Sequence, residues 1–223
     1  MRNEPVPPMA AVFPLPGSVL FPKVLLPLRI FEPRYKTMLR DLLDSHGWIA
    51  IGLQKFEREL DEKGEPDVFP VAGLGRLVDY QKAEDGTYKI VVLGEHRVRL
   101  RGWLQVKPYA IAKLERLPEL EPEGGTREDL RGRLRARIKD LVRQSADSQV
   151  LMLLDQTIKE CEEIGPLVDS IAYHFLQSPK EKQRLLETSD TVEREQLLIE
   201  LLKRERLGDR TATLDNEADM KES

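Results

Sequence analysis

The sequence has one cysteine, Cys161, and only three histidines, which lie far apart in the chain. A single cysteine cannot form an intramolecular disulfide, and the histidines do not join it in the closely spaced ligand set that a structural zinc ion requires. We therefore expect no metal and no other cofactor. A lone reduced thiol is typical of the cytoplasm, where we expect the protein to reside.

Long apolar runs are also missing. The most apolar stretch, Met9 to Leu28, contains four prolines and Lys23, which the helical core of a signal peptide does not tolerate. No other window approaches the roughly 20 uninterrupted apolar residues of a membrane-spanning helix. We expect no contact with a membrane.

An excess of positive charge is absent as well. The 35 basic and 39 acidic residues give a net charge of -4, which provides no general attraction to nucleic acid. The hydrophobic content of 40% is sufficient for a compact core. The composition therefore favours a globular chain for which no nucleic-acid partner is expected.

Sequence motifs for catalysis are missing as well. No G-x-x-x-x-G-K-[ST] sequence is present to hold a nucleotide phosphate. The serines lie in predicted turns, caps or helices, and none has the glycine-bearing loop and partner lysine of a serine-lysine peptidase. The carboxylates fall in caps and on solvated helix faces, so no acid-base pair is indicated. We assign no catalytic residue and expect the protein not to be an enzyme.

The first half of the chain, by contrast, is rich in strand signals. Short segments of β-branched and aromatic residues alternate with Gly and Pro, and Asp85-Gly86 is typical of a tight hairpin turn. One helix, Glu32 to Gly47, interrupts the strands, because its apolar residues recur at helical spacing. The predicted strands are 11–15, 26–31, 48–54, 71–81, 87–103 and 109–117.

After the Pro- and Gly-rich run from Leu117 to Thr126, every segment has helical periodicity. Ser178 with Glu181, and Asp190 with Glu193, are typical of helix-capping boxes. The predicted organisation is a disordered N-terminus (1–9), a β lobe (10–118), a linker (119–126), a helical bundle (127–207) and a disordered acidic tail (208–223).

Three blocks of sequence resemble, in order and spacing, the N-terminal substrate-binding domain of the ATP-dependent Lon protease. They are FPLPGSVLFPKVLLPLRIFEPRYKTML (13–39), VAGLGRLVDYQKAEDGTYKIVVLGEHRVRL (71–100) and DSIAYHFLQSPKEKQRLLETSDTVEREQLLIELL (169–202). The resemblance implies an α+β fold, in which a PUA-like pseudo-barrel of about six strands with one helix precedes a C-terminal α-helical bundle. It also implies a non-catalytic module that binds unfolded polypeptide and presents it to a protease or chaperone.

The first candidate site is the proline-bounded segment from Pro14 to Pro27. Its prolines prevent it from pairing regularly in a central strand, so some of its apolar side chains are candidates to form a groove for unfolded polypeptide. The alternative is that they pack beneath a loop as part of the core. The candidate polypeptide-binding residues are Leu15, Val19, Leu20, Phe21 and Leu25.

The second candidate site is a row of arginines at alternate positions, Arg97, Arg99 and Arg101. Such a row is a candidate anion-binding face, which a PUA-like fold would use for nucleic acid or a small ligand. The alternatives are a solvated sheet face or salt bridges to the helices. Arg97 also falls at the G-x-x-R position of the resemblance, which favours a structural role.

Overall fold

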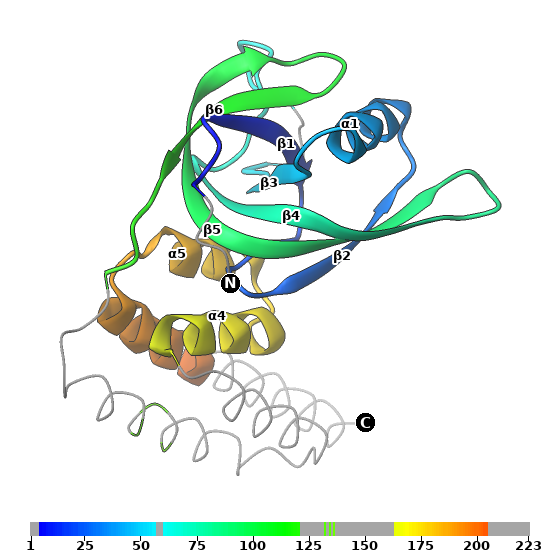
Figure 1. Ribbon diagram of the computed structural model, residues 1–223. Coiled ribbons are helices and arrows are strands. Elements are labelled where there is room, and N and C mark those ends of the chain that lie inside the picture. Colours follow the sequence, from blue (N-terminus) through cyan, green and yellow to red (C-terminus); the bar gives the residue numbers. More distant parts are fainter. Residues whose placement is uncertain are drawn as a thin grey trace, which may run out of the picture. The chain divides into compact units, whose positions relative to one another are not determined.

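The computed structural model describes residues 5–56, 60–120 and 163–204, together with 132, 134 and 136 (Figure 1). The predicted acidic tail, most of the linker and most of the helical segments before Glu163 lie outside these residues. The chain divides into two compact units. The first comprises Met1–Pro118 and Lys182–Ser189, and the second comprises Glu119–Glu181 and Asp190–Ser223.

Six strands form the sheet of the first unit, and each overlaps a strand expected from the sequence. The predicted turn at Asp85-Gly86 joins two of them, since Gly86 has a φ of 73° and Ala83 N donates to Thr87 O at 2.9 Å. The strands are β1 (Met9–Leu15), β2 (Leu25–Ile30), β3 (Trp48–Leu53), β4 (Val71–Lys82), β5 (Tyr88–Gln105) and β6 (Ala110–Arg116).

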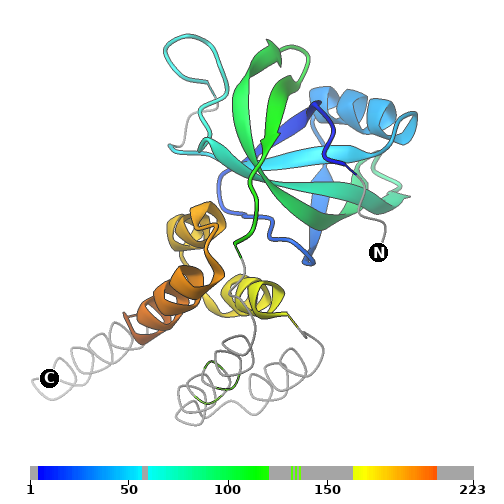
Figure 2. The same cartoon turned by 60° about the vertical axis from the view of Figure 1, so that its left-hand side comes forward.

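The strands close into a barrel because β5 is long enough to pair twice on one side. The order is β2-β5-β4-β3-β1-β6, and β6 also pairs with β5. The first part of β5 lies antiparallel to β2, whereas the part from Val98 onward pairs with β6. Strands β1 and β3 are parallel to each other. Figures 1 and 2 show the barrel from two sides.

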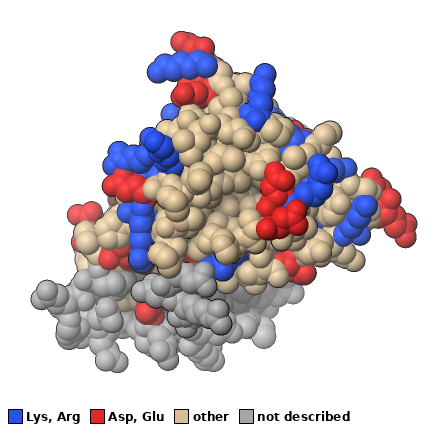
Figure 3. All heavy atoms as spheres, turned by 45° about the horizontal axis from the view of Figure 1, so that its top comes forward, with Lys and Arg blue, Asp and Glu red and all other residues tan. Residues whose placement is uncertain are grey.

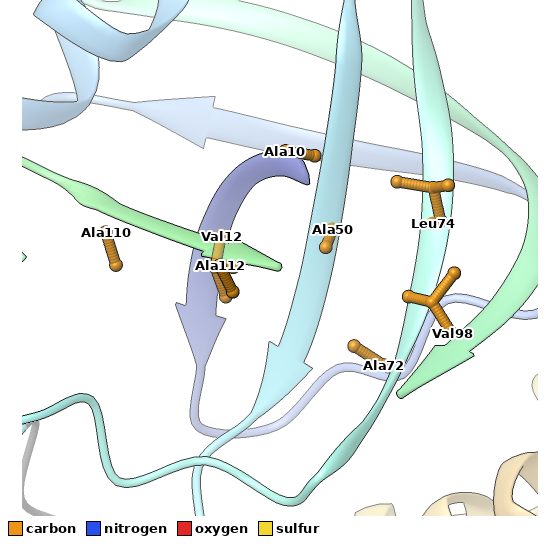
Figure 4. Close-up of a cluster of buried hydrophobic side chains, with 8 residues drawn as sticks. All are labelled: Ala10, Val12, Ala50, Ala72, Leu74, Val98, Ala110 and Ala112. Atoms are coloured by element: carbon orange, nitrogen blue, oxygen red, sulfur yellow. The ribbon is translucent and has the colours of Figure 1, made fainter. Parts of the chain in front are cut away.

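The interior of the barrel is filled by small side chains. Figure 4 shows eight of them, drawn from β1, β3, β4, β5 and β6 and pointing toward one another. Five of the eight are alanines, because a narrow closed barrel leaves little room inside for large residues. The cluster comprises Ala10, Val12, Ala50, Ala72, Leu74, Val98, Ala110 and Ala112.

The ordered part of the first unit begins before residue 10. Val6 packs against the alanine-rich cluster, and Leu114 N donates a hydrogen bond to Pro8 O at 2.9 Å. Part of the stretch predicted to be disordered therefore contributes to the barrel, because its apolar residues find a surface that the sequence alone does not reveal.

Helix α1 (Pro33–Leu43) packs on the outside of the barrel. The ring of Tyr35 lies 4.4 Å from that of Phe13, which points away from the barrel interior because its neighbour Val12 points into it. The helix is shorter than expected. It ends at Leu43, and the chain then turns to reach Gly47, whose φ is 69°.

Most of helix α5 (Pro179–Glu187) also belongs to the first unit. Gln183 Nε2 donates to Val71 O at 2.9 Å, and Arg97 Nε donates to Leu186 O at 3.2 Å. The sequence placed all of residues 127–207 in the helical bundle, so the assignment differs here. The reason is that residues of Lys182–Ser189 form hydrogen bonds with Val71 of β4 and with the buried Arg97 of β5.

The second unit contains α4 (Ile164–Phe175) and a helix over residues 191–204. The predicted caps are confirmed. Asp190 Oδ1 accepts from Val192 N at 2.8 Å and from Glu193 N at 3.0 Å, and Ser178 Oγ accepts from Glu181 N at 3.4 Å. With the barrel and these helices, the predicted α+β fold class is confirmed.

A buried ion pair holds the helices of the second unit together. Arg194 and Asp169 are both fully buried, and Arg194 Nε lies 3.3 Å from Asp169 Oδ1. Arg194 also contacts Glu119, which joins the start of this unit to its last described helix. Removing either partner of such a pair is costly, because the remaining charge would be left buried without compensation.

Candidate functional site

The proline-bounded segment lies mainly in the core. Val19, Leu20 and Phe21 are at most 2% exposed, Leu15 is half-buried, and Leu25 is 55% exposed. Three of the five candidate polypeptide-binding side chains are therefore unavailable at the surface. Their burial corresponds to the alternative raised from the sequence, in which these side chains pack inside the fold.

Glycines in the neighbouring strands explain why this segment can lie so deep. A Cβ atom at Gly73 would stand 1.9 Å from Leu20 O, and one at Gly94 would stand 2.0 Å from Phe21 O. The backbone is also paired there, since Lys23 N donates to Gly94 O at 2.7 Å. These glycines are required because any side chain would collide with the segment's backbone.

The arginine row does not form one open cationic face. Arg97 is 3% exposed and is held by Leu186 O, which is a structural role. Arg101 pairs with Glu115, and its hydrogen bond lowers the pKa of that carboxyl, with a smaller contribution from the charge of Arg99. The positive charges at the exposed end of the row are thus partly balanced by Glu115.

A cavity of about 300 Å³ lies in the first unit between three segments that the sequence did not bring together. They are the first turn of α1, the connection from β3 to β4, and the turn from β5 to β6, which share one end of the barrel (Figure 1). The lining residues are Arg34, Leu60, Gly64, Val106, Lys107 and Pro108.

Exposed apolar side chains occur within these three segments or beside them: Phe56, Leu60 and Val106 lie within them, whereas Phe31 precedes α1 and Leu104 lies at the end of β5. Such side chains are unusual on a monomer surface when they gather around a hollow. Figure 3 shows this end of the barrel, with an uncharged area in the middle and charged residues mainly around its edge. The side chains, 39% to 63% exposed, are Phe31, Phe56, Leu60, Leu104 and Val106.

The walls of the cavity are held by hydrogen bonds. Tyr109 OH donates to Asp41 Oδ2 at 2.6 Å, which fastens the β5–β6 turn to α1. Burial, and then this hydrogen bond, raise the pKa of Tyr109 to about 12. In the β3–β4 connection, Asp61 Oδ1 accepts from Lys63 N at 2.8 Å and from Glu65 N at 2.9 Å. The cavity is therefore largely preformed.

Two cations line the cavity, and they differ in their partners. Arg34 Nε donates to Glu32 Oε2 at 2.9 Å, and its guanidinium lies 4.5 Å from the centre of the Tyr35 ring. Lys107 is exposed and forms no ion pair with any residue that the structure describes. The lining thus combines apolar surface with the positive charge of Lys107, which no described residue balances.

The described lining of the cavity offers apolar and cationic groups, which are suited to binding, and none of these described residues is a nucleophile or a carboxylate. Among residues 5–56, 60–120 and 163–204, no group of three His, Cys, Asp or Glu side chains is arranged to hold a metal ion. No helix in the described part of the chain is both long and apolar enough to cross a membrane.

Comparison with known proteins gives one consistent family. Residues 9–204 match the family model described as the ATP-dependent protease La (LON) substrate-binding domain. Lon protease 2 of Syntrophobacter fumaroxidans is 30% identical over 191 residues, which are 86% of this chain and 24% of that protein. Lon protease 2 of Sorangium cellulosum is 30% identical over 217 residues, covering 92% of this chain and 26% of its own. This chain spans about a quarter of the length of these relatives.

Solved structures show the same fold. The N-terminal domain of Mycobacterium avium complex Lon protease superposes with a TM-score of 0.68 at 16% identity, covering 87% of this chain and 98% of that one. A Lon N-terminal domain protein from Xanthomonas campestris superposes with a TM-score of 0.57 at 21% identity, covering 85% and 96% of the two chains.

Proposed function

Because the chain belongs to the Lon substrate-binding domain family, we propose that it binds apolar segments of unfolded polypeptides at the cavity between α1, the β3–β4 connection and the β5–β6 turn. The family supports a substrate-binding module, and the proposal adds the class of substrate and the place where it binds.

One observation carries the proposal: two of the residues that line the cavity, Leu60 and Val106, are themselves exposed apolar side chains. An apolar side chain that enters the cavity leaves water, and its neighbours in the bound chain can cover Leu60 and Val106. Each buried leucine-sized side chain contributes about 1.5 kcal/mol or more, so a few contacts suffice for reversible binding.

The proposed role is recognition without turnover. The lining residues provide no catalytic group, and the sequence contains no nucleotide-binding G-x-x-x-x-G-K-[ST] motif. We further propose that a bound segment is passed to a separate protease or chaperone. Affinity purification with an unfolded client present should then enrich an ATPase, and a failure to enrich one would contradict this second step.

Binding can be measured by the fluorescence anisotropy of a labelled, permanently unfolded polypeptide titrated with the protein. We expect Leu60→Ser and Val106→Ser each to weaken binding by roughly tenfold, because each removes apolar contact worth about 1.5 kcal/mol. Both side chains are exposed, so the melting temperature should not change.

Val78→Ser is the matched control for Val106→Ser. Val78 is 50% exposed on β4 and is not among the cavity-lining residues. The control should bind as the wild type does. Equal binding by all three variants would show that the polypeptide binds elsewhere and would remove the proposed site.

A further inference from the structure

Resting on the proposed function, we infer that the cavity selects an apolar side chain whose neighbour in the same polypeptide carries a carboxylate. The occupant is thus an internal apolar–acidic pair, Phe-Glu for example, of an unfolded chain. The size of the cavity, the charges of its lining and the hydrogen bonds of its loops carry the inference.

The size limits how much of a chain can enter. A volume of about 300 Å³ lies at the lower end of the range found for ligand pockets. It accommodates one bulky side chain rather than a folded segment. The residues on either side of that side chain must therefore remain outside the cavity, within reach of charged lining residues such as Lys107.

The charges at the lining favour a carboxylate at that position. Both charged lining residues are cations. Glu32 already binds Arg34, whereas Lys107 has no ion pair among the described residues. The β3–β4 connection carries acidic residues as well, but those of its described residues that line the cavity are Leu60 and Gly64. A neighbouring carboxylate would supply the partner that Lys107 lacks.

The loop hydrogen bonds favour an acidic side chain over a terminal carboxylate. Capture of a chain terminus usually relies on a set of free backbone N–H groups. At the tip of the β3–β4 connection these groups are occupied, since Asp61 N bonds Glu65 O and Gly64 N bonds Asp61 O. The N–H groups of Lys63 and Glu65 bond the Asp61 carboxylate. The single, mobile ammonium of Lys107 suits an acidic side chain within a chain.

The test uses three short Gly/Ser peptides, each with a blocked N-terminus, a C-terminal amide and a fluorescent label. The first contains Phe-Glu, the second Phe-Gln and the third Ser-Glu. Anisotropy titrations with the full chain at low salt should give binding of Phe-Gln, about threefold tighter binding of Phe-Glu, and no binding of Ser-Glu. The preference for Glu should vanish in 0.5 M salt.

Lys107→Gln should abolish the preference for Phe-Glu while leaving the affinity for Phe-Gln unchanged. Lys113→Gln is the matched control, because Lys113 is exposed on β6 and does not line the cavity. It should keep the preference.

The outcomes separate this inference from the proposed function. Equal affinity for Phe-Glu and Phe-Gln, or a preference that survives Lys107→Gln, overturns the inference and leaves polypeptide binding intact. A preference that appears only when the amide is replaced by a free carboxylate also overturns it, in favour of chain-end recognition. Failure of both Phe peptides, and of a permanently unfolded polypeptide, to bind overturns the proposed function itself.

Discussion

Val19, Leu20 and Phe21 of the proline-bounded segment, and Leu60 and Val106 at the cavity, all lie outside the six strands, yet the first three are core and the last two are surface. Val19, Leu20 and Phe21 are buried, whereas Leu60 and Val106 are 44% and 39% exposed. The difference arises in the strands that lie beneath. Gly73 and Gly94 leave room for the backbone of the proline-bounded segment. No described glycine makes such room for Leu60 or Val106. An apolar loop sequence therefore does not identify a binding surface unless the residues that lie beneath the loop are known.

The largest expected effect is a difference in the free energy of unfolding between variants of two phenylalanines, one buried and one exposed. Phe21→Ala should lower the free energy of unfolding by about 3 to 5 kcal/mol, because it empties a fully packed site. Phe31→Ala should change it by no more than about 0.5 kcal/mol, because Phe31 is 63% exposed. Urea unfolding followed by circular dichroism measures both values. Similar losses for the two variants would show that the regions do not differ in this way.

The next test concerns Gly94, one of the two glycines that make room for the proline-bounded segment. Gly94→Ala should cost about 3 kcal/mol, because the new methyl group would overlap Phe21 O and force the backbone to move. Gly17→Ala is the control, since a Cβ atom there meets nothing within 4 Å. Thermal unfolding of the two variants is the measurement. A melting temperature for Gly94→Ala equal to that of the control would mean that the close approach does not determine the burial.

A smaller effect should arise from the wall of the cavity. The pKa of Tyr109 is raised to about 12 in the folded protein, above the value of 10.0 that is ordinary for a tyrosine. The neutral phenol therefore stabilises the fold fully below pH 10, and this contribution is lost as pH rises toward 12. The free energy of unfolding should fall by about 1 kcal/mol between pH 9 and pH 11 through this residue.

Tyr109→Phe isolates that contribution. The variant should be less stable at pH 8 by about 1 kcal/mol, because the hydrogen bond to Asp41 is lost. Its stability should also fall less steeply between pH 9 and pH 11 in urea titrations. If variant and wild type lose stability in parallel over that range, the pKa of Tyr109 is not raised by its surroundings.

The smallest expected effect is at Leu25, the most exposed of the five candidates in the proline-bounded segment. Leu25→Ser should change the free energy of unfolding by less than about 0.5 kcal/mol. Binding of unfolded polypeptide, measured by anisotropy, should equal that of the wild type. Weaker binding with unchanged stability would show that Leu25 belongs to the binding surface. The proline-bounded segment would then not differ from the cavity as proposed.

Local signals in the sequence were sufficient for most of the fold. The six strands, the Asp85-Gly86 turn and the caps at Ser178 and Asp190 depend on residues close in sequence, and all of them are present. Helix α1 was predicted four residues too long, to Gly47 rather than Leu43, because the glycine that ends the turn was taken for the end of the helix. Such boundaries depend on how the next strand is reached.

The candidate site was less accessible to sequence reasoning. The glycine-punctuated strands were visible as a pattern, but the pattern does not say which backbone approaches Gly73 and Gly94. Arg97 was placed correctly as a strand residue, yet its partner, Leu186 O, lies 89 positions away. The cavity combines residues between 34 and 108, so no window of the sequence contains it.

By itself, the sequence determined the α+β class, the strand order along the chain and the family resemblance, because these depend on periodicity and on blocks of neighbouring residues. Only the tertiary structure decided which apolar residues are core and which are surface. Burial depends on what the closed barrel brings opposite each side chain, and glycines distant in sequence make the room for Leu20 and Phe21 while leaving Leu60 and Val106 at the surface.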